Sequence, residues 1–475
     1  QLKKSLNPLS VWAIAFGCII GWGSFINPGK KFLPNSGVAG TAIAMVLGAL
    51  VMMIISVSYA YMVPKHPKAG GEFTFTKSNF GKIPAFICGW FLVAAYLTNV
   101  PMNSTAIPLI MEGLFDKTAV SWGVGSYAIA GSTVYLGGIV VAVLFLVGFA
   151  VLNILGVEKA GFIQKALAIT LAVCAFTLCI SGIVYAIKDG VHFNPLWGYD
   201  KEVLKTTGNI KANSWAPAIL ATFAIAPWAF VGFDTIPQAA EEFNFPFKRV
   251  IKIMIIAILF GAFVYISNNT ICAVALENWP ELLNNDGNTW LVLEAAKKML
   301  GVPGAVLVGF GVASAVLSGM MGFYLASSRL MWSMAKDGFL PRTFAKLDEK
   351  HQTPRNALIF CLIVSLVGPF LGREALGWFV DMSSIGASIG FFFTCLCAAR
   401  EIRRDKDGSM FKFICAITGC VFSVLFMILQ LIPIPGFESV HFVWQSYVML
   451  GVWVLLGVAF FLWQRKKIGV PVEIE

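Results

Sequence analysis

Long apolar segments separated by short polar stretches run through the whole chain. Because a helix needs roughly 20 apolar residues to cross the hydrocarbon of a bilayer, this pattern predicts twelve membrane-spanning helices. The expected spans cover residues 9–33, 38–63, 83–111, 132–154, 161–187, 215–240, 250–275, 302–334, 355–371, 375–399, 410–432 and 441–463. No polar stretch has the character of a separate soluble domain, so we expect residues 1–475 to form a single membrane domain.

The sixth segment is interrupted near its middle by residues that disfavour a membrane helix. Pro227 lacks an amide hydrogen and clashes with the preceding turn, and Gly232 lowers the cost of leaving the helical conformation. Asp234 carries a charge that is costly in hydrocarbon unless it faces a cavity or a partner. Since non-helical backbone at membrane depth survives only where it is buried in protein or lines a site, we predict a broken helix with a functional role.

The first segment contains a second interruption, a glycine-rich run. Gly17 and Gly21 alone would be typical of close helix packing. The further glycine at position 23 and the polar Ser24 beside it favour an unwound stretch instead.

These two interrupted segments occupy corresponding positions in two groups of five. Because five is an odd number, the second group must enter the membrane from the opposite side, and paired interruptions in such inverted repeats mark a substrate site near the midplane. A helix that stops there leaves N–H and C=O groups unpaired, and these can hold a carboxylate and an ammonium group. We assign the first repeat to residues 9–187, the second to residues 215–399, and two additional helices to residues 410–463.

Composition agrees with an integral membrane protein and narrows the chemistry. The 475 residues are 58% hydrophobic and 13% charged, against about a quarter charged in soluble domains. The ten cysteines lack metal or redox spacing, and the four histidines lie outside or at the ends of the apolar segments. We therefore expect no metal site, no cofactor and no catalytic set at membrane depth, and do not expect an enzyme.

Lys and Arg are unevenly distributed between the two sides of the membrane. With the N-terminus inside, 25 of the 35 basic residues fall at the cytoplasmic ends of the segments, as the positive-inside rule requires. We predict a multi-pass plasma-membrane protein with both termini in the cytoplasm and without a cleaved signal peptide. The net charge of +10 is spread over many short loops, which argues against a nucleic-acid partner.

Three motifs resemble those of the amino acid-polyamine-organocation (APC) transporters. The run Gly21-Trp22-Gly23-Ser24-Phe25 resembles the glycine-x-glycine motif of the family's first helix. The runs Trp228-Ala229-Phe230-Val231-Gly232-Phe233-Asp234 and Ala239-Ala240-Glu241-Glu242 resemble its sixth helix. Ser328-Arg329, residues 334–341 and residues 353–357 are similar to its signature between helices eight and nine. The resemblance implies an all-α, leucine-transporter-type fold of two inverted five-helix repeats and two extra C-terminal helices.

The same resemblance implies where a substrate would bind. The backbone N–H groups that would receive its carboxylate belong to Gly21, Trp22 and Gly23, beside Ser24. The carbonyl groups that would receive its amino group belong to Ile19, Ile20, Ala229 and Phe230.

Several side chains are candidates for the pocket wall. Trp228 matches a tryptophan that lines the pocket of arginine/agmatine-type exchangers, and its alternative is packing on lipid or a neighbouring helix. Phe230 and Phe233 are candidate gating aromatics, and Phe323 falls near an aromatic wall position of the family. The amide of Asn99 either bonds the ligand or forms a hydrogen bond between helices.

The coupling ion stays open between a proton and sodium. Asp234 matches an acidic residue that acts in gating or proton sensing in the family, and its alternative is a helix N-cap. Several proton-linked members carry a lysine within helix five, whereas residues 167–172 contain none and Lys165 lies nearer the cytoplasmic end. A sodium site, if present, would use Thr170, Ser314 and Ser318, although the serines can also bond back to their own helix.

We expect a secondary transporter that moves a small amino acid by alternating access. Within this class the alternatives are an amine or polyamine transporter and an amino acid/amine exchanger. For an amine, Asp234, Glu241 and Glu242 would supply negative charge, although we expect the two glutamates to lie at a solvated cytoplasmic helix end. A channel is the alternative from another class, but it needs a continuous polar pore, and the segments contain few polar positions.

Overall fold

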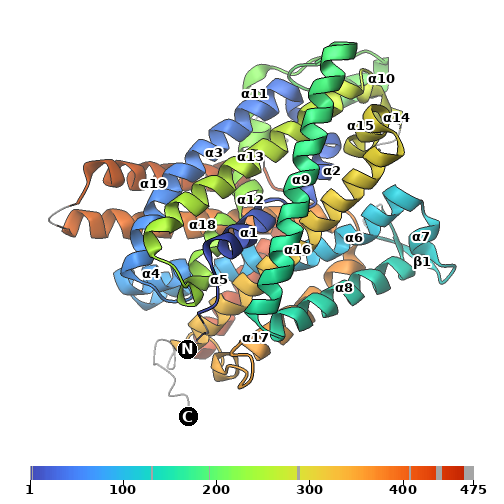
Figure 1. Cartoon of the computed structure of the whole chain (residues 1–475). Helices are drawn as coiled ribbons and strands as arrows, with labels where there is room; N and C mark the ends of the chain where they lie inside the picture. The colour runs from blue at the N-terminus through green and yellow to red at the C-terminus, as the bar shows by residue number, and fades with distance from the viewer. Residues whose placement is uncertain are drawn as a thin grey trace.

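The computed structural model of the chain is almost entirely helical (Figure 1). It describes residues 2, 4–129, 132–191, 193–285, 289–405, 408–434 and 441–464, without the side chains of residues 157–159 and 464. The one sheet among these residues is a hairpin of β1 (Ser126–Ile129) and β2 (Ser132–Tyr135). This hairpin was not predicted, and it delays the start of the fourth expected span until Leu136.

Nine helical stretches among the described residues are long and apolar enough to cross a membrane. They contain α3 (Leu33–Lys65), α5 (Lys82–Leu97) with α6 (Asn99–Phe115), α8 (Leu136–Ile154), α9 (Val157–Asp189), α13 (Val250–Ala275), α16 (Val302–Lys336), α18 (Ala375–Arg404), α19 (Met410–Leu431) and α20 (Trp444–Gln464). Their bounds lie within a few residues of nine of the expected spans.

The other three expected spans are divided into shorter pieces. The pieces are α1 (Pro8–Ile19), α2 (Gly23–Asn27) and the π-helical turn η1 (Pro28–Phe32); α11 (Trp215–Phe223), α12 (Ala226–Phe230) and the 3₁₀ turns η2 (Phe233–Thr235) and η3 (Pro237–Glu242); and α17 (Arg355–Ser365) with the 3₁₀ turn η6 (Gly368–Leu371). The breaks predicted in the first and sixth segments are confirmed. The ninth segment is a short apolar helix over Arg355–Leu371 that changes from α to 3₁₀ geometry near its end. A count of twelve spans does not follow from helix length alone.

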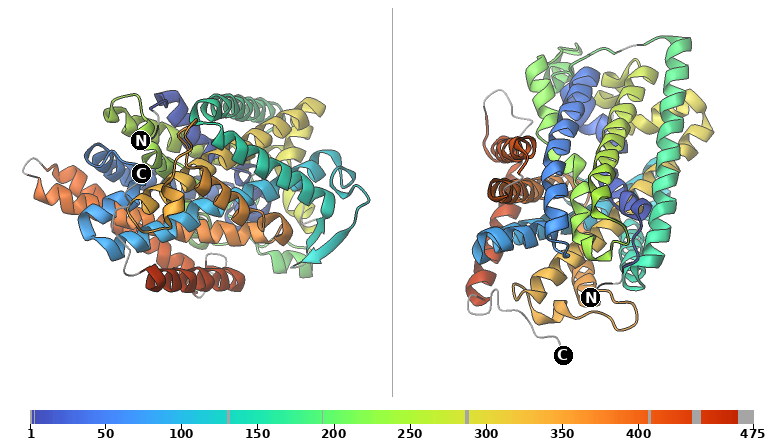
Figure 2. Two further views of the ribbon diagram at one scale, coloured as in Figure 1. Left: turned by 90° about the horizontal axis from the view of Figure 1, so that it is seen from below. Right: turned by 60° about the vertical axis from the view of Figure 1, so that its left-hand side comes forward.

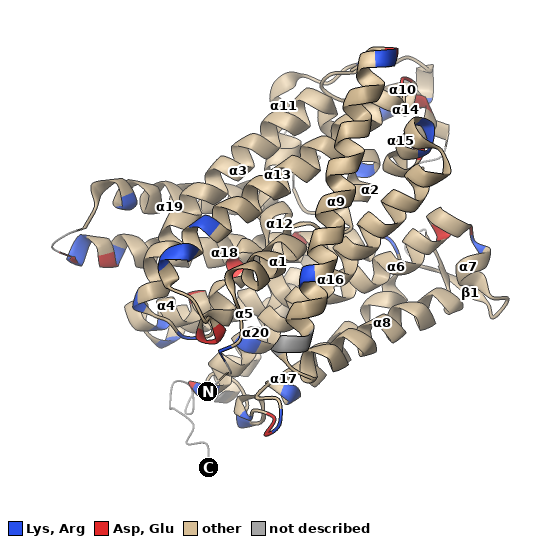
Figure 3. Cartoon of the chain, in the orientation of Figure 1, with Lys and Arg blue, Asp and Glu red and all other residues tan. Residues whose placement is uncertain are grey.

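Shorter helices lie at the two ends of the bundle. They are α4 (Gly71–Phe80), α7 (Thr118–Ser121), α10 (Lys201–Thr207), α14 (Trp279–Asn285), α15 (Leu291–Leu300), η4 (Phe247–Arg249) and η5 (Arg342–Ala345). Figure 1 shows α4 and α17 towards the end that carries the N-terminus, here called the N-terminal end, and α10, α14 and α15 at the opposite end. Figure 3 shows the charged residues gathered mainly towards these two ends, with a largely uncharged wall between them.

The interior is built around α16, which packs against α1, α6 and α9, while α3 packs against α11 and α13. On the other side α18 packs against α5 and α19. Figure 2 shows α19 and α20, in orange to red, along one side of the bundle. The broken pieces α1 and α12 therefore lie inside a shell of continuous helices.

Gly37 lies inside α3 and marks a kink in the helical run that begins at Gly23. Its backbone has φ 63° and ψ −164°, a conformation that costs L-residues strain. A Cβ at this position would lie 2.3 Å from the carbonyl oxygen of Leu196 and 2.4 Å from the nitrogen of Gly198. Only glycine fits this turn, which separates the first expected span from the second.

We expect Gly37→Ala to lower the free energy of unfolding by about 1–3 kcal/mol, because it adds backbone strain and a steric clash. Thermal unfolding in detergent measures this loss. Gly148→Ala on α8 is the matched control, since a Cβ there meets no atom within 4 Å. Equal unfolding temperatures for the two variants would contradict the requirement for glycine at position 37.

Candidate functional site

The backbone leaves the helical path between α1 and α2. Ser24 closes this turn, since its hydroxyl and its N–H both donate to the carbonyl oxygen of Gly21, at 3.0 and 3.3 Å. The N–H groups of Gly21, Trp22 and Gly23 donate to no acceptor among the described residues. Three consecutive donors without a partner, at the start of a helical run, suit an anionic group.

The opposite partial charge is offered by the end of α12. The carbonyl oxygens of Ala229 and Phe230 receive no donor from the described part of the chain, and the same holds for Ile20. The carbonyl of Ile19 differs, because it accepts the hydroxyl of Tyr265 at 3.2 Å. Three of the four predicted carbonyls are thus available to a ligand's ammonium group.

The two unwound stretches lie against each other. Gly232, with φ 145°, makes this approach possible, since a Cβ there would lie 2.6 Å from the nitrogen of Ile19. A Cβ on Gly23 would lie 2.3 Å from Cη2 of Trp228. The rings of Trp22 and Trp228 lie beside each other, with centroids 6.3 Å apart and planes tilted by 53°. The two tryptophans therefore cover the unwound backbone.

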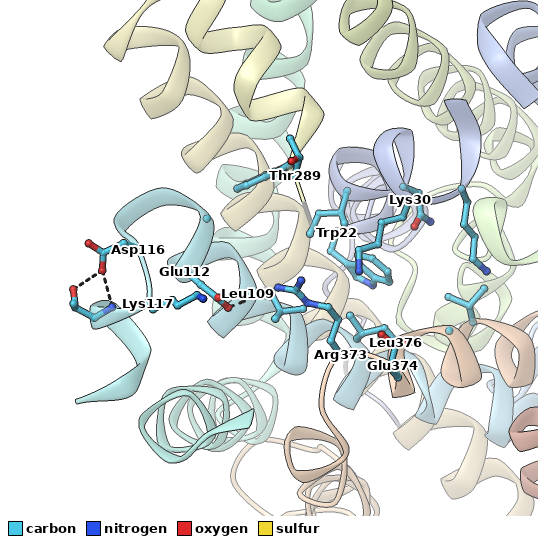
Figure 4. A pocket seen from close by; sticks show the side chains of 18 residues that line it. Trp22, Lys30, Leu109, Glu112, Asp116, Lys117, Thr289, Arg373, Glu374 and Leu376 are labelled. Carbon is cyan, nitrogen blue, oxygen red and sulfur yellow. Dashed lines mark hydrogen bonds and ion pairs between the residues drawn. The ribbon is translucent and has the colours of Figure 1, made fainter. Parts of the chain in front are cut away.

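A cavity of about 710 Å³ lies beside Trp22 (Figure 4). Its lining includes Thr289 and Trp290, which directly precede α15 at the end of the bundle opposite the N-terminus. Its lining includes the charged residues Lys30, Lys31, Glu112, Asp116, Lys117, Arg373 and Glu374. Figure 4 shows Trp22 and Lys30 on one side and Glu112 and Arg373 on the other. Among the predicted site residues only Trp22 lines the cavity, so the unwound backbone lies beneath its floor.

The N-terminal end is closed by a buried ion pair. Nε of Arg329 on α16 lies 2.8 Å from Oε1 of Glu242, and both side chains are almost completely buried. The carbonyl oxygen of Glu242 also accepts the N–H groups of Ser5 and Leu6 at 3.0 and 2.9 Å. The expectation that Glu242 lies at a solvated helix end is therefore wrong. Neighbouring Glu241 is half-buried and accepts the N–H of Ala69 at 3.2 Å.

Asp234 does not line the cavity and is fully buried. Its Oδ1 accepts the N–H of Gly232 at 2.7 Å, and its Oδ2 accepts the hydroxyl of Tyr96 at 2.9 Å. The first bond runs backwards along the chain, unlike the forward bond of an N-cap. The carboxylate links the broken sixth segment to α5.

The remaining aromatic candidates pack within the protein. Phe230 lies beside Tyr265, and Phe233 stacks on Phe391 with centroids 5.4 Å apart. The ring of Phe323 lies 6.4 Å from that of Tyr96. None of the three aromatic candidates lines the described cavity, so their role in gating stays a prediction.

Two of the four polar candidates on the surrounding helices, Asn99 and Ser318, have local partners. The amide nitrogen of Asn99 donates to the hydroxyl of Ser383 on α18 at 2.7 Å. Of the two roles considered for Asn99, a bond to the ligand or a hydrogen bond between helices, this contact is the second. Ser318 donates to the carbonyl of Ala315 on its own helix at 3.1 Å. Ser314 is buried and Thr170 is half-buried. A sodium site at Thr170, Ser314 and Ser318 stays a prediction.

Two amides that sequence reasoning missed lie beside the broken first helix. Gln164 of α9 donates to the carbonyl of Ala13 at 3.0 Å, and its amide nitrogen lies next to Gly17. Asn103 of α6 places Oδ1 beside Gly21, and this buried oxygen has no partner among the described residues. The position of Asn103 one helical turn after Asn99, in an apolar helix, was the available signal.

Comparison with known proteins finds similar sequences over most of the chain. The sequence model of the amino acid permease family matches residues 6–456. The branched-chain amino acid permease BcaP of Bacillus subtilis is 24% identical over 98% of this chain and 94% of its own length. The large neutral amino acids transporter small subunit 2 of Homo sapiens is 27% identical over 77% of this chain and 64% of its own length. The serine/threonine exchanger SteT of Bacillus subtilis is 26% identical over 77% and 76%.

The buried ion pair makes a prediction about stability. Arg329→Leu leaves the carboxylate of Glu242 buried without its partner, and we expect a loss of about 3–5 kcal/mol. The matched control is Lys77→Gln, which breaks the half-exposed pair between Lys77 and Asp337 (2.8 Å) and should cost less than about 1 kcal/mol. Denaturation followed by tryptophan fluorescence in detergent compares the two. A similar loss of unfolding free energy in both variants would contradict a buried ion pair between Arg329 and Glu242.

Proposed function

The chain belongs to the amino acid permease family of the APC superfamily, and we propose that it carries neutral amino acids across the plasma membrane by alternating access. In this proposal the α-carboxylate binds the N–H groups of Gly21, Trp22 and Gly23. The α-ammonium group binds the carbonyls of Ile20, Ala229 and Phe230, and Ser24 holds the turn in place.

The observation that carries this proposal is the pairing of unsatisfied backbone groups. Unpaired N–H and C=O groups are costly at membrane depth, where no solvent replaces the lost hydrogen bonds. An amino acid brings a carboxylate and an ammonium group separated by one carbon, and so satisfies donors and acceptors together. The unpartnered Oδ1 of Asn103, beside Gly21, offers the ammonium group a further acceptor.

The surroundings of the unwound backbone favour a neutral side chain on the substrate. Trp22 and Trp228 supply apolar walls. Asp234, the acidic residue of this stretch, is already bonded to Gly232 and Tyr96. An amine or polyamine would need a free carboxylate near the site, and Glu242 is paired with Arg329. The relatives named for branched-chain and large neutral amino acids agree with this choice.

The proposal also assigns orientation and topology. The three divided spans would act as membrane crossings one, six and nine, which gives twelve crossings as two inverted groups of five and two extra helices. The N-terminal end would face the cytoplasm, in line with the distribution of Lys and Arg. The described cavity would then face outside, so this conformation is open to the exterior and closed towards the cytoplasm.

The floor of the cavity argues against a channel. The cavity ends at Trp22, and beneath it the predicted site residues are buried. A channel needs a continuous path, whereas alternating access needs a site closed on one side at a time. Transport by purified protein in liposomes should therefore saturate and should show counterflow, in which internal unlabelled substrate accelerates uptake of the labelled amino acid. Linear flux without counterflow would contradict a transporter.

A glycine substitution tests the site directly. Gly23→Ala places a Cβ 2.3 Å from Cη2 of Trp228, so the ring, which is a wall of the proposed site, must shift. We expect at least a tenfold fall in counterflow of leucine or any other amino acid that the wild type transports. A loss of this size corresponds to about 1.4 kcal/mol or more of binding free energy.

Gly148→Ala on α8, whose added Cβ meets nothing within 4 Å, should transport like the wild type. Thermal shifts with a panel of amino acids and amines check binding separately, because a ligand that binds the folded state raises its apparent stability. Unchanged transport by Gly23→Ala in a folded protein would rule out this site.

A further inference from the structure

Two carboxylates lie close together beneath the proposed substrate site. Glu72 on α4 and Asp234 after the break in the sixth segment are both completely buried. The hydroxyl of Tyr96 lies between them, 2.9 Å from Oδ2 of Asp234 and 3.3 Å from Oε1 of Glu72. Three separate parts of the chain thus converge on one small polar cluster.

Neutral groups supply all the hydrogen bonds of this cluster. Glu72 also accepts the hydroxyl of Tyr59 at 2.8 Å and the amide nitrogen of Gln238 at 2.6 Å. Asp234 accepts the N–H of Gly232. No Lys, Arg or His donates to either carboxylate in the described part of the chain. Two like charges buried this close without a cation are strongly unfavourable, whereas one shared proton relieves the repulsion.

The other ionisable groups around the cluster do not supply the missing positive charge. α4 packs against α5, α18, η3 and α16. The titratable neighbours are Tyr59 of α3, Cys88 and Tyr96 of α5, and Cys18 of α1. Arg329 of α16 is engaged by Glu242. Burial and then the charge of Asp234 raise the pKa of Glu72, which lies on α4 outside the spans, to about 8.

We propose that Glu72 and Asp234 form a binding site for one proton, which is taken up from the cytoplasm when this end closes and returned when it opens. The inference rests on the alternating access and orientation proposed above. A protonated Glu72 can donate to Tyr96, whose hydroxyl then donates to Asp234, so that one proton satisfies the whole cluster.

Opening of the cytoplasmic side would take this site apart. Asp234 and Gln238 belong to the broken sixth segment, whereas Glu72, Tyr59 and Tyr96 belong to α4, α3 and α5. Separation of these parts breaks the bonds from Tyr96 to Asp234 and from Gln238 to Glu72. Both carboxyls then meet water, where they ionise, and the proton passes to cytoplasmic water. An acidic cytoplasm would therefore hold the transporter in the conformation open to the outside.

The conformational equilibrium of the full-length protein tests this site. Spin labels at positions 248 and 403, both exposed at the N-terminal end, report the distance across the closing elements. In the wild type we expect the ratio of open to closed protein to rise by up to tenfold per pH unit between about pH 5 and pH 8 and then to level off, since opening releases one proton in that window.

Glu72→Gln carries an amide in place of the carboxyl and should remain closed throughout this range. Asp337→Asn is the matched control, because Asp337 pairs with Lys77 at the same end outside the cluster, and it should keep the wild-type response. A wild type whose distances do not change with pH, or a Glu72→Gln variant that responds like the wild type, would overturn the site.

Infrared spectra of the wild type give a second test that does not depend on folding of the variant. They should show the carbonyl stretch of a protonated carboxyl at pH 7, and this band should be lost above about pH 8 as the raised pKa of Glu72 is passed. Absence of the band at pH 7 would overturn the proposal. Loss of amino acid counterflow in the wild type would instead contradict the proposed transport function, so the two failures are distinguishable.

Discussion

Backbone polar groups that cannot be left unpaired within a membrane determine most of this architecture. Where α1 and α12 stop, neighbouring helices satisfy part of what the lost helical turns exposed. Tyr265 bonds the carbonyl of Ile19, and Asn268 and Trp290 bond the carbonyls of Ser24 and Phe25 at 3.0 and 2.8 Å. The groups that these side chains do not reach are those proposed to bind substrate. The protein therefore satisfies part of the exposed backbone, and in our proposal the substrate satisfies the rest.

The same constraint explains the concentration of glycine around α1. A Cβ on Gly17 would lie 2.5 Å from Gln164, one on Gly322 would lie 2.3 Å from Sγ of Cys18, and one on Gly261 would lie 2.5 Å from Ile19. Because these glycines lack a side chain, the neighbouring residues pack directly against α1 and exclude water from the unwound turn. A larger side chain at any of these positions would separate the parts that form the site.

Most of the spans and the two breaks could be predicted from the sequence, because both depend on local properties. Apolar length predicted nine helices within a few residues, and Pro227 with Gly232 predicted the interruption of the sixth segment. The burial of Glu72 was not predictable in this way, because it lies in a polar stretch between two spans and is buried only when α4 packs beneath α5 and α18. The partners of Asn99 and Gln164 likewise depend on which helices become neighbours, and hydropathy contains no information about that.

The closed end of the transporter is held by charged and polar groups, and this choice affects how easily it can open. A buried ion pair gains little net stability, because its attraction must offset the loss of hydration of both ions. When Arg329 and Glu242 separate into water, they recover that hydration, whereas an apolar seal of the same area would lose its full burial energy. The cluster of Glu72 and Asp234 behaves in the same way, since water stabilises both carboxylates. A seal made of such groups excludes water while it is shut, yet it leaves only a small free-energy difference between the closed and open ends. The alternating access proposed above needs such a balance, because a strongly stabilised closed state would slow every cycle.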